Sequence, residues 1–114
     1  MGLNDGALVL YSAQEEKDED VDAIVAATVG LRVVGYSYRE SASGADVAAF
    51  NIINGATGAT GSEIAMVELA ANGSGEEWMW PGVDCRNGLS LEVVTGTVSV
   101  CIYYAIFYPL GGGK

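Results

Sequence analysis

The sequence predicts an all-β fold, a single antiparallel β-sandwich of about eight strands with jelly-roll-like or immunoglobulin-like connections. Short runs of β-branched and aromatic residues alternate with glycine-containing turns, which is typical of such folds. Apolar residues make up 50% of the 114 residues, enough for one domain with a buried core. The last long run has an apolar residue at every second position, as a half-buried strand requires.

Turn signals divide the chain into its elements. Four dipeptides tolerate the positive φ angles of tight hairpins: Asp5-Gly6, Asn54-Gly55, Asn72-Gly73 and Asn87-Gly88. Between the turns lie the segments that we expect to be strands: residues 7–11, 31–39, 46–53, 62–71, 76–80, 89–94 and 97–108.

Residues 20–29 are ambiguous between helix and strand. Val21, Ile24, Val25 and Thr28 fit one helical face, with acidic residues at its start. Alternate residues fit a strand equally well, and the β-branched content with Gly30 favours the strand.

The periodicity also predicts which residues share a face. In 31–39 we expect one face to carry Arg32, Val34, Tyr36 and Tyr38. In 97–108 one face carries Val98, Val100, Ile102, Tyr104, Ile106 and Tyr108, and the other carries Thr97, Ser99, Cys101, Tyr103, Ala105 and Phe107. The predicted core includes Val33, Phe50, Ile52, Val67, Leu69, Leu91, Val100 and Ile102.

Large residues on both faces of 97–108 indicate a covered surface. One face of a strand in a small sandwich normally meets water, yet Tyr103 and Phe107 occupy the second face here. Tyr108 ends the same run. We therefore expect Tyr103, Phe107 and Tyr108 to contact another subunit or a partner.

Trp78 and Trp80 alternate on one predicted strand face. Tryptophans in this arrangement usually anchor a core or a subunit interface, and we favour that interpretation. The alternative is a platform on which a sugar ring stacks.

An acidic run occupies residues 15–22. It holds six carboxylates: Glu15, Glu16, Asp18, Glu19, Asp20 and Asp22. Such a run repels itself, so we expect a solvated loop or arm. A calcium site would need a different ligand spacing and a glycine, and the remaining alternative is contact with a basic partner surface.

Composition argues against several functional classes. The formal net charge of -10, with 15 acidic and 5 basic residues, disfavours nucleic acid as a partner. The lack of histidine removes the usual general base and metal ligand, so we expect no enzyme, no cofactor and no metal. No signal-peptide pattern and no membrane-spanning apolar run is present. Cys85 and Cys101 are expected to be buried free thiols, although a disulfide stays open.

Residues 31–108 resemble small virion proteins of tailed bacteriophages, of the capsid decoration or cement type. The resemblance is carried by "VVGYS", "FNIINGAT" and "PGVDCRNGLSLEVVTGTVSVCIYY", and spans about two thirds of the chain. It implies a structural protein on the virion surface, made in the host cytoplasm. It further implies binding to a major capsid protein as a homo-oligomer, with a trimer favoured.

Three parts of the chain follow from these expectations. Residues 1–30 form an N-terminal strand plus the acidic segment or arm, 31–110 the sandwich body, and 111–114 a flexible tail. The alternative function is a carbohydrate- or receptor-binding module of a phage head or tail appendage. The expected contact residues are Trp78, Trp80, Tyr103, Phe107, Tyr108, Glu15, Glu16, Asp18, Glu19 and Asp20.

Overall fold

The computed structural model describes residues 8–17, 19–41 and 47–107, and of 8–17 the backbone alone. Every regular element in these residues is a strand. The strands are β1 (Leu8–Lys17), β2 (Val21–Val25), β3 (Leu31–Glu40), β4 (Ala48–Asn54), β5 (Ser62–Leu69), β6 (Ser74–Asp84), β7 (Leu89–Thr95) and β8 (Val98–Phe107).

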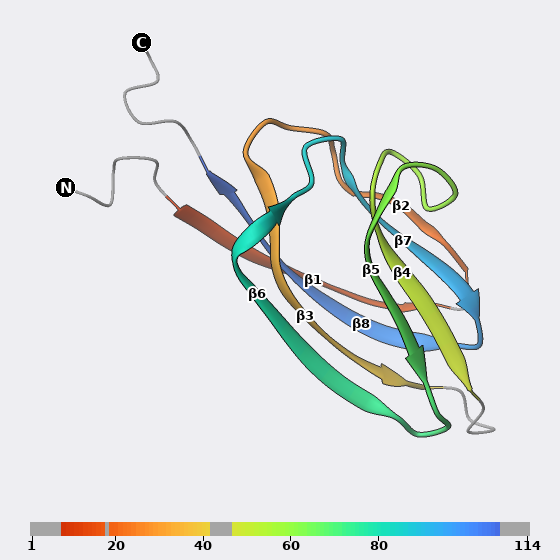
Figure 1. Ribbon diagram of the computed structural model, residues 1–114. Coiled ribbons are helices and arrows are strands. Elements are labelled where there is room, and N and C mark those ends of the chain that lie inside the picture. Colours follow the sequence, from red (N-terminus) through yellow and green to blue (C-terminus); the bar gives the residue numbers. More distant parts are fainter. Residues whose placement is uncertain (1–7, 18, 42–46, 108–114) are drawn as a thin grey trace, which may run out of the picture.

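The strands form two antiparallel four-stranded sheets in the orders β1-β8-β3-β6 and β2-β7-β4-β5 (Figure 1). This order arises because the chain folds back on itself at the β4–β5 turn. The fold-back pairs β4 with β5, β3 with β6, β2 with β7 and β1 with β8. The resulting double ribbon is then distributed over the two sheets, which is the jelly-roll arrangement. The predicted β-sandwich is therefore confirmed, and the strand order selects the jelly roll over the immunoglobulin fold.

The core lies between the two sheets. Of the predicted core residues, Val67 is partly buried against the core, and the others are buried: Val33, Phe50, Ile52, Leu69, Leu91, Val100 and Ile102. Tyr36 and Tyr38 of β3 meet Phe50 of β4 edge-on, with ring centroids 6.5 and 5.5 Å apart. These contacts join the two sheets, because β3 and β4 belong to different ones.

A bulge in β3 overturns the predicted face of this strand. The register with both neighbours shifts between Val33 and Gly35. Tyr36 and Tyr38 consequently pack on the core. Arg32 and Val34 lie on the opposite side, where both would contact a Cβ atom added at Gly82. The expectation that these four residues share one face is therefore wrong, because an inserted residue reverses the alternation.

The first two strands differ in extent from the prediction. β1 continues to Lys17, well past the predicted end at residue 11, and pairs with β8 in unbroken register. The ambiguous segment 20–29 is a strand only over Val21–Val25. Its register with β7 is irregular, and Ala23 has a φ of 49°.

Candidate interaction face

The outer side of the β1-β8-β3-β6 sheet gathers most of the aromatic residues singled out from the sequence. In β8, Val100 and Ile102 point into the core, so Tyr103 and Phe107 lie on the other side, as predicted. In β6, Met79 packs against the core, which places its neighbours Trp78 and Trp80 outside. We call the group formed by Arg32, Trp78, Trp80, Tyr103 and Phe107 the outer aromatic face.

Trp78 and Tyr103 stack on this face although their strands are not adjacent. Their ring centroids are 5.0 Å apart and their planes differ by 6°. Gly35 of β3 lies between the two strands and pairs with both residues. A Cβ atom at Gly35 would come within 2.6 Å of Cε3 of Trp78. The glycine therefore leaves the space that the indole fills.

Two hydrogen bonds fix these rings. The indole N–H of Trp78 donates to a carboxylate oxygen of Glu76 at 2.6 Å. The hydroxyls of Tyr103 and Ser37 lie 3.3 Å apart and share a hydrogen bond. Rings held in this way lose little conformational entropy when they bind a partner.

Trp80 and Phe107 form the second aromatic pair. Their centroids are 6.4 Å apart, at an interplanar angle of 49°. The guanidinium of Arg32 lies 5.6 Å from the Phe107 ring centroid, within cation–π range, and donates to the carbonyl of Gly82 at 3.4 Å. One end of the face is thus both aromatic and positively charged.

Both tryptophans remain accessible. Trp78 is 55% exposed and Trp80 is 61% exposed, whereas a large apolar side chain in a monomeric protein is usually covered. The structure therefore brings together Trp78, Trp80, Tyr103 and Phe107, four of the predicted contact residues. Their role in contact stays a prediction.

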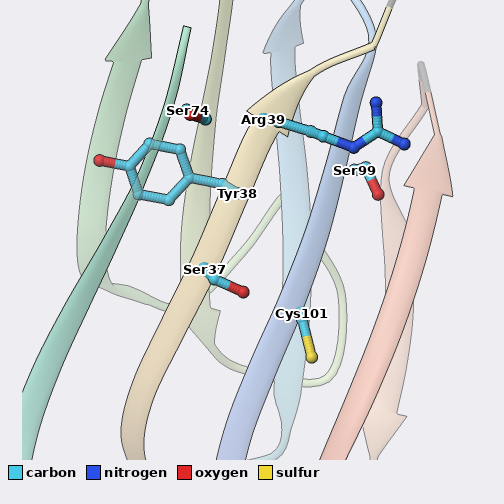
Figure 2. A pocket seen from close by; sticks show the side chains of 6 residues that line it. All are labelled: Ser37, Tyr38, Arg39, Ser74, Ser99 and Cys101. Atoms are coloured by element: carbon cyan, nitrogen blue, oxygen red, sulfur yellow. The ribbon is translucent and has the colours of Figure 1, made fainter.

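A small polar pocket adjoins the outer aromatic face. It encloses about 170 Å³ and is lined by Ser37, Tyr38, Arg39, Ser74, Ser99 and Cys101. Figure 2 shows Ser37, Ser99 and Cys101 on the neighbouring strands β3 and β8, with Arg39 extending from β3 over β8. Hydroxyl groups and a guanidinium suit hydrogen bonding to an oxygen-rich group.

The two cysteines are separate and differ in burial. Cys85 is fully buried, and its thiol donates to the carbonyl of Gly88 at 3.2 Å. Burial, with a smaller contribution from the charge of Asp84, raises the pKa of Cys85 to about 12. Cys101 is a free thiol as well, but it is partly exposed, so the expectation of two buried thiols holds for Cys85 alone.

The acidic run does not gather into one site. Tyr108 and Asp18 lie outside the described residues, and the backbone of Glu15 and Glu16 pairs in β1 with Val100 and Ser99. Glu19 is exposed. The arm or loop that we expected over this run is therefore a strand at Glu15 and Glu16.

Two carboxylates of the run instead accept hydrogen bonds from backbone amides. Asp20 accepts a hydrogen bond from the amide of Val93 at 2.9 Å, and Asp22 accepts one from the amide of Gly58 at 2.7 Å. They tie β7 and the β4–β5 connection to the start of β2. Sequence reasoning missed this role, because the bonds join residues 73 and 36 positions apart.

In the described part of the chain, no group of three or more histidine, cysteine or acidic residues is arranged to hold a metal ion. The same residues include no helix long and apolar enough to cross a membrane.

Comparison with known proteins finds a match among solved structures alone. No protein-family model and no curated protein matches the chain. Among solved structures, it is similar to a chain from work titled "Bacillus endospore appendages form a novel family of disulfide-linked pili". The sequence identity is 15%, the TM-score is 0.46, and the match covers 93% of each chain.

Proposed function

We propose that the chain is a non-enzymatic structural protein that acts by contact, with the outer aromatic face as its binding surface. The observation that carries the proposal is the exposure of Trp78 and Trp80, 55% and 61%, on rings that neighbouring side chains hold in place. Covering such rings releases much apolar surface from water at a small entropic cost.

The specific form of the proposal is decoration of a bacteriophage capsid. The resemblance of residues 31–108 to capsid decoration proteins supports it, and the jelly roll is a fold that viral capsid proteins also use. In this form the partner is a major capsid protein and the site of action is the virion surface. Many copies of a small protein on one shell add weak contacts by multivalency, so no single contact has to be strong.

The test is to locate the protein on particles and then to replace Trp78 and Trp80. Particles purified from the producing culture on a density gradient should contain the chain, detected by mass spectrometry. Particles stripped of it should rebind the wild type and bind the Trp78→Ser/Trp80→Ser double variant roughly tenfold or more weakly.

Val29→Ser is the matched control for this experiment. Val29 is 74% exposed in the β2–β3 connection, outside the outer aromatic face, so its loss should leave rebinding unchanged. Absence of the chain from every particle fraction, or rebinding of the double variant at wild-type strength, would contradict the proposal.

A second candidate is carbohydrate binding on the same face. The stacked Trp78–Tyr103 pair beside a pocket of hydroxyls and Arg39 favours it. Titration with a panel of oligosaccharides, followed by tryptophan fluorescence, separates the two functions. A saturable change in emission that Trp78→Ser abolishes would favour the sugar, whereas unchanged emission favours protein contact.

A further inference from the structure

We propose that the outer aromatic face of one copy docks onto the outer side of the β2-β7-β4-β5 sheet of a second copy, head to tail. Trp80 of the first copy then occupies a hollow on the second. This inference rests on the proposed function, because it names a second copy of the chain as a further partner of the same contact surface, besides the capsid protein.

The outer side of the β2-β7-β4-β5 sheet is acidic. Phe50 and Ile52 of β4 point into the core, so Asn51 lies on the outer side, paired with Met66 of β5 and Glu92 of β7. Glu63 and Glu68 of β5 are exposed and pair with Ile53, which is buried, and with Ala49. The four strands of this sheet contain no lysine or arginine. We call this surface the outer acidic face.

The outer acidic face also exposes apolar side chains. Met66 is 71% exposed, and Val94 and Val47 are 59% and 57% exposed. Beside them lies a hollow of about 460 Å³ around Ala49, whose lining includes both apolar and polar atoms, among them those of Val47, Glu68 and Thr95. A cavity of about 150 Å³ already holds a benzene ring, so this hollow has room for an indole.

The charges of the two faces complement each other. Arg32 and Arg39 both project from β3 on the outer side of the β1-β8-β3-β6 sheet, in a chain with only 5 basic residues. Among the described acidic residues of that side, Glu76 accepts the Trp78 indole N–H, and Asp84 pairs with Arg86 at 3.1 Å. The guanidinium of Arg32, at the aromatic end of this face, can face Glu63 and Glu68 of a second copy.

Trp80 fits the hollow by chemistry as well as by size. Within the described residues, its ring contact is with Phe107, and more than half of its side chain meets solvent. The carboxylate of Glu68 in the hollow can accept the indole N–H of Trp80 from a second copy. An aromatic side chain that enters a pre-existing pocket elsewhere on the same molecule creates a heterologous contact.

The geometry determines what such contacts build. The two faces lie on opposite sides of a two-layer sandwich (Figure 1), so each added copy leaves one face of each kind free. Repeated docking therefore gives an open stack of copies that grows with concentration. A contact between two identical faces would instead stop at a dimer.

Complementation between two blocked variants tests the inference. Trp80→Ser removes the anchor but keeps the outer acidic face, and Glu68→Arg reverses the charge at the hollow but keeps the outer aromatic face. Light scattering over a concentration series should show wild-type masses rising above the 11.8 kDa of one chain. Each variant alone should associate roughly tenfold or more weakly, whereas an equimolar mixture should form a dimer with one copy of each.

Controls and outcomes separate this inference from the proposed function. Val29→Ser should self-associate like the wild type, and Val94→Lys should reproduce the effect of Glu68→Arg; thermal unfolding checks that every variant is folded. A single-chain mass at all concentrations, a fixed trimer, or no dimer in the mixture would overturn the head-to-tail contact. If such a chain still binds particles, the proposed function survives; a self-associating chain absent from all particles contradicts the proposed function alone.

Discussion

Gly35 determines whether the largest rings of the outer aromatic face can meet. It lies on β3 between Trp78 and Tyr103, and a Cβ atom there would come within 2.6 Å of the indole and 3.0 Å of the Glu77 carbonyl. A glycine inside a strand normally weakens it, so its use here indicates a close approach between side chain and backbone.

Gly35→Ala is therefore expected to displace Trp78 and destabilise the fold by about 1–3 kcal/mol, the usual cost of overpacking. Near-ultraviolet circular dichroism should report the loss of the Trp78–Tyr103 stack, and urea unfolding the loss of stability. In a Trp78→Ala background the same substitution should cost much less, because the indole is gone. Equal costs in both backgrounds would show that the indole is not what Gly35 accommodates.

Ser90 has a fully buried hydroxyl that joins β2 to the connection between β4 and β5. It donates to the carbonyl of Gly55 at 2.8 Å and accepts the amide of Ala23 at 2.9 Å, where the backbone of β2 has a positive φ. Ser90→Ala leaves both backbone groups without this partner, so we expect a loss of about 1–3 kcal/mol in the free energy of unfolding. Ser62→Ala, at an exposed position, is the control and should be nearly neutral.

Cys85 and Cys101 should react at very different rates with a thiol reagent. The raised pKa of Cys85, about 12, keeps its thiol protonated at neutral pH, and its burial excludes the reagent. We expect one fast modification, removed by Cys101→Ser, and a second one only on unfolding. Fast modification of the Cys101→Ser variant in the native state would contradict the burial of Cys85.

The same pKa shift has a consequence for stability. A folded pKa above the ordinary value of 9.0 means that the buried thiol favours the folded state below pH 9. That contribution is lost as the pH rises from 9 toward 12. The free energies of unfolding of the wild type and of Cys85→Ala should therefore converge over this alkaline range.

At the scale of single elements, alternation predicted β8 correctly and β3 only in part. In β8 every second residue from Val98 to Ile106 packs in or against the core, because its register with β1 is unbroken and the residue inserted in its pairing with β3 belongs to β3. In β3 the bulge at Val34 exchanges the faces, and no residue in "VVGYS" signals a bulge except Gly35. A prediction from strict alternation fails wherever an inserted residue exchanges the two faces of a strand.

Ile102→Asp tests the faces of β8. Ile102 is 1% exposed, so the substitution would bury an unpaired carboxylate, and we expect the protein not to fold. Cys101→Asp places the same carboxylate one residue earlier, on the partly exposed outer side, and should give a folded protein. Circular dichroism and solubility distinguish the two. A folded Ile102→Asp variant together with an unfolded Cys101→Asp variant would mean that the faces are inverted.

The ends of the elements were harder to predict than their interiors. The acidic sequence around Glu15 and Glu16 predicted a solvated loop, yet the backbone there pairs with β8. Local charge repulsion is weak compared with the cost of leaving the edge of a long strand unpaired, and the partner strand is more than 80 residues away along the chain. Such a pairing is invisible to any local pattern.

For the whole molecule, composition and turn spacing were enough to predict the sandwich, but not the strand order. The order follows from the double ribbon folded at the β4–β5 turn, which depends on pairings between distant strands such as β1 and β8. The same arrangement brings Trp78, Trp80, Tyr103 and Phe107 onto one surface from two strands that are not neighbours. The sequence singled out these residues individually, and the topology assembles them.

The division of the chain into residues 1–30, 31–110 and 111–114 stays a prediction, and residues 111–114 lie outside the described part. So does the trimer. The sandwich has two unlike faces on opposite sides, one aromatic with arginines and one acidic with a hollow.

The most direct test of a contact-making structural role is an electron cryomicroscopy map of the particle with which the protein copurifies. The account predicts the jelly roll seated in the particle with Trp78 and Trp80 covered by protein. A map in which both tryptophans face solvent, or in which the jelly roll is missing from the particle, would contradict it.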